Sequence, residues 1–298
     1  MLILIADAFD ASLPERLAKF GEVTDDMARI KEANVLLVRS KTKVTKEMVD
    51  QAPALKLVIR GGVGLDNVDR EACKARDIVV KNTPQASSVA VAELTMALML
   101  AVPNRIVEAH NSMKEGKWLK KELKRTELKD KTLVIVGMGL IGQEVAKRAH
   151  AFSMNVIGVD PFILGSALAS EVAARLDEVL ERADYISLHT PLTEVTRGLI
   201  NKEHLDLMKD GVVIINTCRG KVVVEEDLAA ALKSGKVAAY ATDVYYNDPP
   251  DAASPLLSAP NVLMMPHIGG STTENLLRIG NIVVDLLNKF EKSGAVSK

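Results

Sequence analysis

Cysteine is scarce in this chain: Cys73 and Cys218 are the only two among 298 residues. Two cysteines cannot build a disulfide framework, and they exclude a metal site made of several cysteines. An excess of charge of one sign is also missing, since 38 basic and 39 acidic residues leave a net charge of −1. This balance gives no electrostatic reason to expect a nucleic acid or an anionic membrane as a partner. We expect no bound metal.

Long hydrophobic runs are missing as well. The longest apolar stretch, 89–102, is interrupted by Glu93 and Thr95 and is too short to cross a bilayer. The N-terminal segment 1–7 lacks the basic residues of a signal peptide and is typical of a first strand. Repeats, low-complexity tracts and long linkers are absent. With 48% hydrophobic and 26% charged residues, the composition is that of a soluble globular protein, and we expect a cytoplasmic location.

The most informative segment is a glycine motif, Gly137-Met138-Gly139-Leu140-Ile141-Gly142, because of what surrounds it. The apolar, β-branched run 131–136 predicts a buried strand ahead of it, and 143–152 has the pattern of an amphipathic helix. A second predicted strand, 155–159, ends on Asp160. Strand, glycine turn, helix, strand and acid, in this order, are the fingerprint of a dinucleotide-binding unit.

Each small or acidic residue of this fingerprint has a physical role. Gly137 permits the tight turn, Gly139 lets the backbone approach a pyrophosphate, and Gly142 lets the helix pack closely on the strand. The N-terminus of the helix offers free N–H groups and the positive end of its dipole to the phosphates. Asp160 is placed to bind a ribose diol and to repel a 2′-phosphate, which favours NAD over NADP. The alternative is a tight strand–helix turn that binds no ligand.

The glycine motif lies in the middle of the chain, so another unit must precede it. Strands with helices between them predict a small parallel α/β unit there. The expected strands are 2–6, 35–38, 57–60 and 79–81, and two of the expected helices are 14–20 and 46–52. From residue 131 the strand–helix rhythm restarts with six strands, the number in a doubly wound dinucleotide domain. They are expected at 133–136, 156–159, 185–188, 212–216, 238–242 and 262–264.

Two long helices complete the expected organisation. A helical pattern runs from about Ser88 to Trp118 and is expected to kink or break at Pro103. The last helix, 273–290, is expected to run back and cover the first unit. We therefore predict an α/β protein of two Rossmann-like domains with doubly wound parallel sheets. A substrate domain would comprise residues 1–95 and 275–298, and the NAD-binding domain, residues 96–274, would be inserted into it.

Polar residues follow the predicted strands of the second domain, where open α/β sheets bind their ligands. One arginine, one histidine and two aspartates stand out among them: Arg219, His267, Asp243 and Asp248. Hydride transfer between NAD and a 2-hydroxy acid needs such a set. A histidine can carry the hydroxyl proton near neutral pH, an arginine matches the fork of a carboxylate, and a carboxylate beside the histidine favours its protonated form.

Other roles stay open for two of these polar residues when they are considered alone. His189 ends a predicted strand and is expected to line the cofactor site, with direct chemistry as the alternative. Arg219, taken without its context, is more often an ordinary ion-pair residue.

These motifs, in this order, resemble the D-isomer-specific 2-hydroxyacid dehydrogenase family over nearly the whole chain. The stretches that carry the resemblance are 137–142 with Asp160, 189–193, 216–220, 238–244 and 266–269. Within the family the chain is most similar to the branch that oxidises D-3-phosphoglycerate, through 38–45, 112–118 and 126–128. Larger members of that branch carry a C-terminal regulatory domain that binds serine. Because this sequence ends at Lys298, we expect no such domain and no serine feedback through it.

The resemblance implies roles for the polar residues. Arg219 would clamp the substrate carboxylate and carbonyl, His267 would be the acid/base, and Asp243 would bind the nicotinamide carboxamide. The family has a catalytic glutamate before a proline where this chain has Asp248 before Pro249. Aspartate is one methylene shorter, so we expect its contact with His267 to be longer, bridged by water or absent, and we keep it as the histidine's partner.

The resemblance also implies two sets of contacts. The cofactor would contact Gly137, Gly139, Leu140, Ile141, Gly142, Asp160, His189, Thr190, Pro191, Thr217, Cys218, Asp243, Gly269 and Gly270. The substrate would contact Arg39, Arg60, Gly61, Gly62, Val63, Gly64, Arg219 and His267. Two arginines in the second set suit a phosphate.

The implied activity is NAD-dependent oxidation of D-3-phosphoglycerate to 3-phosphohydroxypyruvate, the first step of serine synthesis. A glyoxylate or hydroxypyruvate reductase, or another D-2-hydroxyacid dehydrogenase, is the alternative of the same class. An NAD-sensing binding protein is the alternative of a different class, and a pure sensor need not keep both Arg219 and His267.

The expected partner besides the small-molecule substrate is a second copy of the chain. The helix at 88–102 is apolar nearly all round and must be covered on all sides. A homodimer through the cofactor domain and this adjoining helix, as the resemblance implies, would cover it. The alternative is a helix buried between the two domains.

Overall fold

The structure is a computed structural model that describes residues 1–292, and the chain divides into two compact units. Unit 1 comprises residues 1–88 together with the chain from residue 270 onward, and unit 2 comprises residues 89–269. Unit 2 is thus inserted into unit 1. The chain passes from one unit to the other after residues 88 and 269, a few residues before the expected boundaries at 95 and 275. The first boundary is earlier because the helix that begins at Ser88 packs with unit 2.

Unit 1 is built on a five-stranded sheet in the order β2-β1-β3-β4-β5, and every neighbouring pair is parallel. This is the flavodoxin-like form of the doubly wound fold. The strands are β1 (Leu2–Ile5), β2 (Glu22–Thr24), β3 (Val35–Val38), β4 (Leu57–Arg60) and β5 (Val79–Asn82). Strand β2 was not expected from the sequence. It is a three-residue edge strand with no fully buried side chain, and so has no hydrophobic pattern to reveal it.

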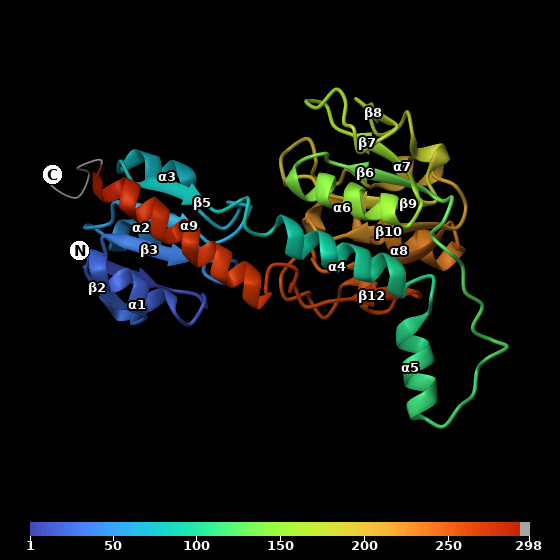
Figure 1. The fold of residues 1–298 in the computed structure, drawn as a ribbon, viewed down its shortest axis with the longest axis horizontal. Coiled ribbons are helices and arrows are strands. Elements are labelled where there is room, and N and C mark those ends of the chain that lie inside the picture. Colours follow the sequence, from blue (N-terminus) through green and yellow to red (C-terminus); the bar gives the residue numbers. More distant parts are fainter. Residues whose placement is uncertain (293–298) are drawn as a thin grey trace. The chain divides into compact units, whose positions relative to one another are not determined.

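Helices cover both faces of this sheet. They are α1 (Leu13–Leu17), α2 (Lys46–Gln51), α3 (Arg70–Ala75) and α9 (Thr273–Lys292), with short 3₁₀ turns at Ala18–Phe20 and Met27–Arg29. Ile279, Val283 and Leu287 of α9 recur every four residues and join one buried cluster with α1 and the sheet (Figure 1). The expectation that the last helix returns to cover the first unit is therefore confirmed.

Unit 2 is built on a seven-stranded parallel sheet in the order β12-β11-β10-β9-β6-β7-β8. The strands are β6 (Thr132–Val136), β7 (Asn155–Val159), β8 (Glu171–Ala173), β9 (Tyr185–Leu188), β10 (Val212–Asn216), β11 (Val237–Thr242) and β12 (Val262–Met264). The order is that of a Rossmann sheet with one further strand. The expected count of six strands was wrong because β8 is a three-residue edge strand without a buried run.

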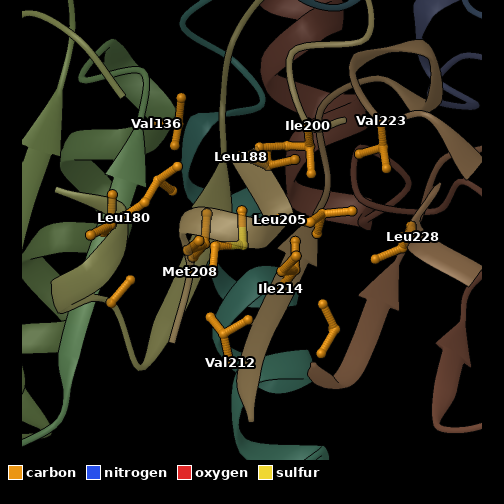
Figure 2. Close-up of a cluster of buried hydrophobic side chains, with 14 of the residues drawn as sticks. Val136, Leu180, Leu188, Ile200, Leu205, Met208, Val212, Ile214, Val223 and Leu228 are labelled. Atoms are coloured by element: carbon orange, nitrogen blue, oxygen red, sulfur yellow. The ribbon is translucent and has the colours of Figure 1, made fainter. Parts of the chain in front are cut away.

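Two hydrophobic cores lie on opposite faces of this sheet. Its helices are α4 (Ser88–Ala101), α5 (Ile106–Lys114), α6 (Leu140–Ala151), α7 (Lys202–Leu207) and α8 (Glu225–Ser234), with 3₁₀ turns at Leu180–Arg182, Gly220–Val222 and Pro255–Leu257. Alternate residues of β10 enter different cores: Val212 and Ile214 face α7 and α8 (Figure 2), whereas Val213 and Ile215 face α4 and α6. Burial on both faces explains the continuous apolar runs of the inner strands.

The long helical pattern from Ser88 breaks, as expected, near Pro103. Helices α4 and α5 meet at 64°, and Arg105 between them has a φ of +51° that cannot continue a helix. Helix α5 ends at Lys114, earlier than the expected Trp118. It projects from the rest of unit 2, and the following chain returns to β6 (Figure 1). Within residues 1–292 no single helix is long and apolar enough to cross a membrane; only the bent pair α4 and α5 reaches that length together.

Candidate functional site

The glycine turn lies at the point where the strand order of unit 2 reverses. Strands β6 and β9 are neighbours in the middle of the sheet, and they lead into Gly137 and His189 respectively. Gly137 has a φ of +100°, and a Cβ there would lie 2.6 Å from the carbonyl oxygen of His189. Only glycine fits this close approach. Open α/β sheets bind their ligands at this switch point.

Gly139 and Gly142 differ sharply in the space around them. A Cβ on Gly142 would lie 2.0 Å from the carbonyl oxygen of Gly137, so the first turn of α6 packs directly on the glycine turn. A Cβ on Gly139, the N-cap of α6, would meet no atom within 4 Å. The open space lies at a helix N-terminus whose first N–H groups lack helical partners. It fits the pyrophosphate of a dinucleotide.

Asp160 ties the glycine turn to the chain that follows β7. Its Oδ2 accepts a hydrogen bond from the N–H of Met138 at 3.0 Å, and its Oδ1 accepts from Phe162 and Ile163 at 2.9 and 3.2 Å. The sequence fingerprint did not reveal this bracing role. Carboxylate oxygens accept more than one hydrogen bond each, so the contacts leave capacity for a ribose.

His189 is neutral in its folded environment. Its Nε2 lies 2.7 Å from the hydroxyl of Ser187, and its Nδ1 is buried with no hydrogen-bond partner. Burial lowers the pKa of His189 from its ordinary value near 6.5 to about 3. With so low a pKa the imidazole of His189 is a weak base, which favours the lining role over direct proton transfer. Its orphaned nitrogen also fits a polar group of a bound cofactor.

The second cluster of polar residues forms where β10, β11 and β12 end. The register pairs Asn216 with Thr242 and Thr242 with Met264, so the three carboxyl ends are level. Arg219, Asp243 and His267 follow these ends within three residues. The fold therefore brings the expected arginine, aspartate and histidine of unit 2 to one edge of the sheet.

Asn216, buried at the end of β10, holds the chain that carries Arg219. Its side-chain Oδ1 accepts from the N–H of Cys218 at 3.1 Å, and its Nδ2 donates to the carbonyl of Arg219 at 3.1 Å. The Arg219 guanidinium donates to the carbonyl of Cys218 at 2.6 Å. Thr217 shares a 2.8 Å hydrogen bond with Thr95 of α4. This part of the site is thus fixed by short polar contacts.

His267 and Asp248 are in direct contact, with Nδ1 and Oδ2 2.6 Å apart. The expectation of a longer, bridged or absent contact was wrong. The chain turns so that the N–H of Tyr245 donates to Oδ1 of Asp248 at 3.2 Å, which brings the shorter side chain within reach. The two side chains are 32% and 40% exposed, so the pair contributes at most about 1 kcal/mol to stability. Its main consequence is a fixed ring orientation.

The backbone at His267 is strained and is held by a buried carboxylate. Its φ of +55° is left-handed, a conformation that costs a non-glycine residue about 1–2 kcal/mol. Asp243 accepts hydrogen bonds from the N–H groups of Ile268 and Gly269 at 2.8 and 2.7 Å, one on each oxygen. Burial raises the pKa of Asp243, and these two donors act in the opposite direction. The sequence predicted a contact of Asp243 with nicotinamide but not this role in holding the main chain after His267.

The remaining residues that were expected to contact substrate lie in unit 1. The Arg39 guanidinium donates to the carbonyls of Ala8 and Gly270 at 3.2 and 3.1 Å, and its Nε is buried without a partner. Burial lowers the pKa of Arg39, and the nearby Asp7 raises it. The side chain of Arg60 folds over Gly62, where a Cβ would meet its guanidinium at 1.6 Å. Both cations therefore lie beside carboxyl ends of their sheet, β3 and β4.

Several contributing residues were missed by sequence reasoning. Asn216, Tyr245 and Asn275 act through side-chain hydrogen bonds to main-chain carbonyls, those of Arg219, Met265 and Gly270 respectively. Asparagine and tyrosine in loops carry no spacing that signals such contacts. Asn216 alone had a positional signal, because it closes a buried strand.

Comparison with known families gives a match over most of unit 2. The family model described as the NAD-binding domain of D-isomer specific 2-hydroxyacid dehydrogenases matches residues 96–269.

Relatives match over nearly the whole chain. The D-3-phosphoglycerate dehydrogenase of Methanocaldococcus jannaschii is 43% identical over 96% of this chain, and the chain spans 57% of that protein's length. The hydroxypyruvate reductase of Thermotoga maritima is 48% identical over 89% of this chain and 86% of its own. Among solved structures, the D-lactate dehydrogenase of Aquifex aeolicus with NAD and lactic acid has a TM-score of 0.87 at 30% identity, covering 98% of this chain and 96% of that one.

Alanine substitutions at Gly139 and Gly142 should separate ligand binding from packing. Gly139→Ala adds a methyl group to open space at an allowed φ of −69°, so stability should change by less than about 0.5 kcal/mol. The affinity for NADH should fall roughly 10-fold or more, because the methyl group blocks the approach of a phosphate. Gly142→Ala should lower the free energy of unfolding by roughly 1–3 kcal/mol through overpacking. Urea denaturation measures the stability of each variant, and a fluorescence titration measures its affinity for NADH. An unchanged affinity in Gly139→Ala would contradict the placement of the pyrophosphate at this glycine.

The depressed pKa of His189 predicts a pH-dependent loss of stability. Above pH 6.5 the imidazole is neutral in both folded and unfolded chains. Between pH 6.5 and 3 the unfolded chain takes up a proton that the folded chain does not. As the pH falls through this range, the free energy of unfolding of the wild type therefore decreases by up to about 1.4 kcal/mol per pH unit more than that of a His189→Gln variant. Urea denaturation of both proteins at pH 7 and pH 5 measures the difference; a difference independent of pH would count against a buried neutral histidine.

Proposed function

Because the chain belongs to the D-isomer specific 2-hydroxyacid dehydrogenase family, we propose that it oxidises D-3-phosphoglycerate to 3-phosphohydroxypyruvate with NAD, the first step of serine synthesis. The observation that carries the dehydrogenase chemistry is the direct contact between His267 and Asp248 at the edge that also presents Arg219. A protein that only senses NAD has no need of an oriented acid/base pair.

Each residue of this edge has one task in the proposed reaction. With its Nδ1–H donated to Asp248, His267 accepts the hydroxyl proton of the substrate at Nε2. The imidazolium that forms is stabilised by the adjacent carboxylate. Arg219 binds the substrate carboxylate through its fork and orients the reacting carbon. Bound NAD supplies the acceptor for the hydride that leaves this carbon.

Residues around the glycine turn would hold the cofactor. The open space at Gly139 and the N-terminus of α6 suit the pyrophosphate, and Asp160 suits the ribose diol of NAD rather than a 2′-phosphate. The orphaned Nδ1 of His189 suits a polar group of the cofactor. Asp243 is proposed to contact the nicotinamide carboxamide in addition to holding the main chain after His267.

Phosphoglycerate as the substrate is supported by the names of relatives and by two cations. Arg39 and Arg60 are proposed to bind the phosphate, and the buried, unpartnered Nε of Arg39 is a donor suited to an anion. A hydroxypyruvate reductase is the second candidate, favoured by the 48% identity to an enzyme of that name. We also propose a cytoplasmic location, since Cys73 and Cys218 are both free and buried.

A substrate panel tests the proposed activity. NAD reduction should be fastest with D-3-phosphoglycerate and slow with D-glycerate, which lacks the phosphate, and NADP should support much less turnover. His267→Ala should lower kcat by about 10²–10⁴-fold. Arg39→Ala and Arg60→Ala should raise the KM for D-3-phosphoglycerate by roughly 10–100-fold, the range for charged hydrogen bonds, with little effect on D-glycerate.

Different outcomes of the panel point to different errors. If the protein reduced hydroxypyruvate or glyoxylate faster than it oxidised any phosphorylated acid, the proposed substrate would be wrong. The proposed hydride-transfer chemistry would stand. NADH binding without turnover of any 2-hydroxy or 2-oxo acid would favour the sensing protein.

We further propose a homodimer, although the apolar helix at 88–102, on which the sequence-based prediction rested, does not support it. Helix α4 carries no exposed large hydrophobic side chain, since its apolar residues join the core of unit 2. Four exposed apolar side chains lie instead on α5 and the chain after it: Ile106, Val107, Met113 and Trp118. Ile106 and Val107, together with the starts of β10–β12, border a cavity of about 900 Å³. A projecting segment with such side chains is typical of a protein interface, and a second copy of the chain is the proposed occupant.

Light scattering at micromolar concentration tests the dimer. Wild type should show twice the chain mass of 32.2 kDa. A variant with Ile106→Asp and Val107→Asp should fall to the mass of one chain, because buried charges without partners disrupt an interface. Phe162→Asp, at a side chain 91% exposed outside this segment, is the matched control and should keep the wild-type mass. A wild-type mass of 32.2 kDa would remove the dimer.

A further inference from the structure

Tyr245 is hydrogen-bonded to Asp248 and to the segment that leads into His267, the two members of the proposed acid/base pair. Its side chain is buried. The phenol O–H donates to the carbonyl oxygen of Met265 at 2.8 Å, two residues before His267. The main-chain N–H of Tyr245 donates to Oδ1 of Asp248 at 3.2 Å. One residue thus binds the segment of the histidine through its side chain and the carboxylate through its backbone.

The contact to Met265 matters because the backbone at His267 is left-handed, with a φ of +55°. Such a conformation persists only where the surrounding contacts determine it. On the far side of His267 the two oxygens of Asp243 hold the next two N–H groups. On the near side Met265 is held by its N–H, which donates to the carbonyl of Thr242 at 2.8 Å, and by its carbonyl, which accepts from Tyr245. Of these two hydrogen bonds to Met265, the one from Tyr245 is made by a side chain and the other by the main chain.

The backbone of Tyr245 also packs against the segment of the substrate clamp. A Cβ on Gly220 would lie 1.9 Å from the carbonyl carbon of Tyr245 and 2.0 Å from its oxygen. The residue after Arg219 must therefore be small for the two segments to meet. Burial raises the pKa of Tyr245 to about 12, so its hydroxyl remains a donor at neutral and moderately alkaline pH.

We propose that Tyr245 is a positioning residue for the reaction, whose hydroxyl fixes the chain leading into His267 while its N–H fixes Asp248. The imidazole and its carboxylate are then aligned before substrate binds. This inference rests on the proposed acid/base role of His267 and assigns no contact with substrate to Tyr245. Its hydroxyl acts on turnover only through His267.

A double-mutant cycle separates positioning from a general structural role. Tyr245→Phe removes only the hydroxyl, and it should lower kcat about 3- to 10-fold, the range for one neutral hydrogen bond, with the KM for NAD within about twofold. The matched control is Tyr246→Phe, because the adjacent Tyr246 is exposed and its ring lies beside Lys221; its kcat should stay within about twofold of wild type. In a His267→Ala background, Tyr245→Phe should have no further effect on kcat.

The cycle has distinguishable outcomes. An equal loss of kcat from Tyr245→Phe in both backgrounds would overturn the inference, since the hydroxyl would then act on the whole fold; thermal denaturation of each variant checks this directly. Equal kcat values for Tyr245→Phe and Tyr246→Phe would also overturn it. If His267→Ala lost turnover while Tyr245→Phe did not, the proposed function would stand and only the inference would fall. Near-normal turnover in His267→Ala would keep the dehydrogenase activity but remove the acid/base role of His267, and the inference for Tyr245 would fall with that role.

Discussion

Neighbouring parallel strands end at the same edge of a sheet, and the proposed chemistry depends on this constraint. Strands β10, β11 and β12 are paired so that Asn216, Thr242 and Met264 lie side by side. The chain leaves each strand at that level and presents Arg219, Asp243 and His267 within a few residues. These residues are distant along the chain, and only the sheet register makes them neighbours. A shift of one residue in any strand would turn every following side chain to the other face.

The polar edge is held mainly through hydrogen bonds to main-chain atoms. Asn216 fixes the chain before Arg219, Asp243 fixes the chain after His267, and the Tyr245 hydroxyl fixes the chain before it. Contacts of this kind set the position of the backbone and leave the functional side chains for ligand. The left-handed residue at His267 shows where the anchoring is concentrated, because strain of this size must be offset by nearby contacts.

The glycine turn in the cofactor half of unit 2 depends on sterics as well as on the hydrogen bonds of Asp160. Gly137 and Gly142 are required because neighbouring carbonyl oxygens occupy the space of a side chain. Gly139 has open space instead, so its lack of a side chain serves the approach of a ligand rather than the packing of the protein. Three glycines of one motif thus follow from two different physical requirements, close packing at Gly137 and Gly142 and open space for a ligand at Gly139.

Patterns that are local in the chain were enough to predict most strands and the cofactor turn. The apolar runs predicted the bounds of β3, β4, β9, β10 and β12 to the residue, and the glycine motif between two strands predicted the dinucleotide turn. Short edge strands such as β2 and β8 were missed because each has only three residues, none of them fully buried, and so carries no periodic pattern. The tertiary structure alone decided that Asp248 reaches His267 directly and that Asp160 and Asp243 hold main-chain N–H groups. Such contacts depend on where separate loops meet in space, and the spacing of residues along the chain carries no record of that distance.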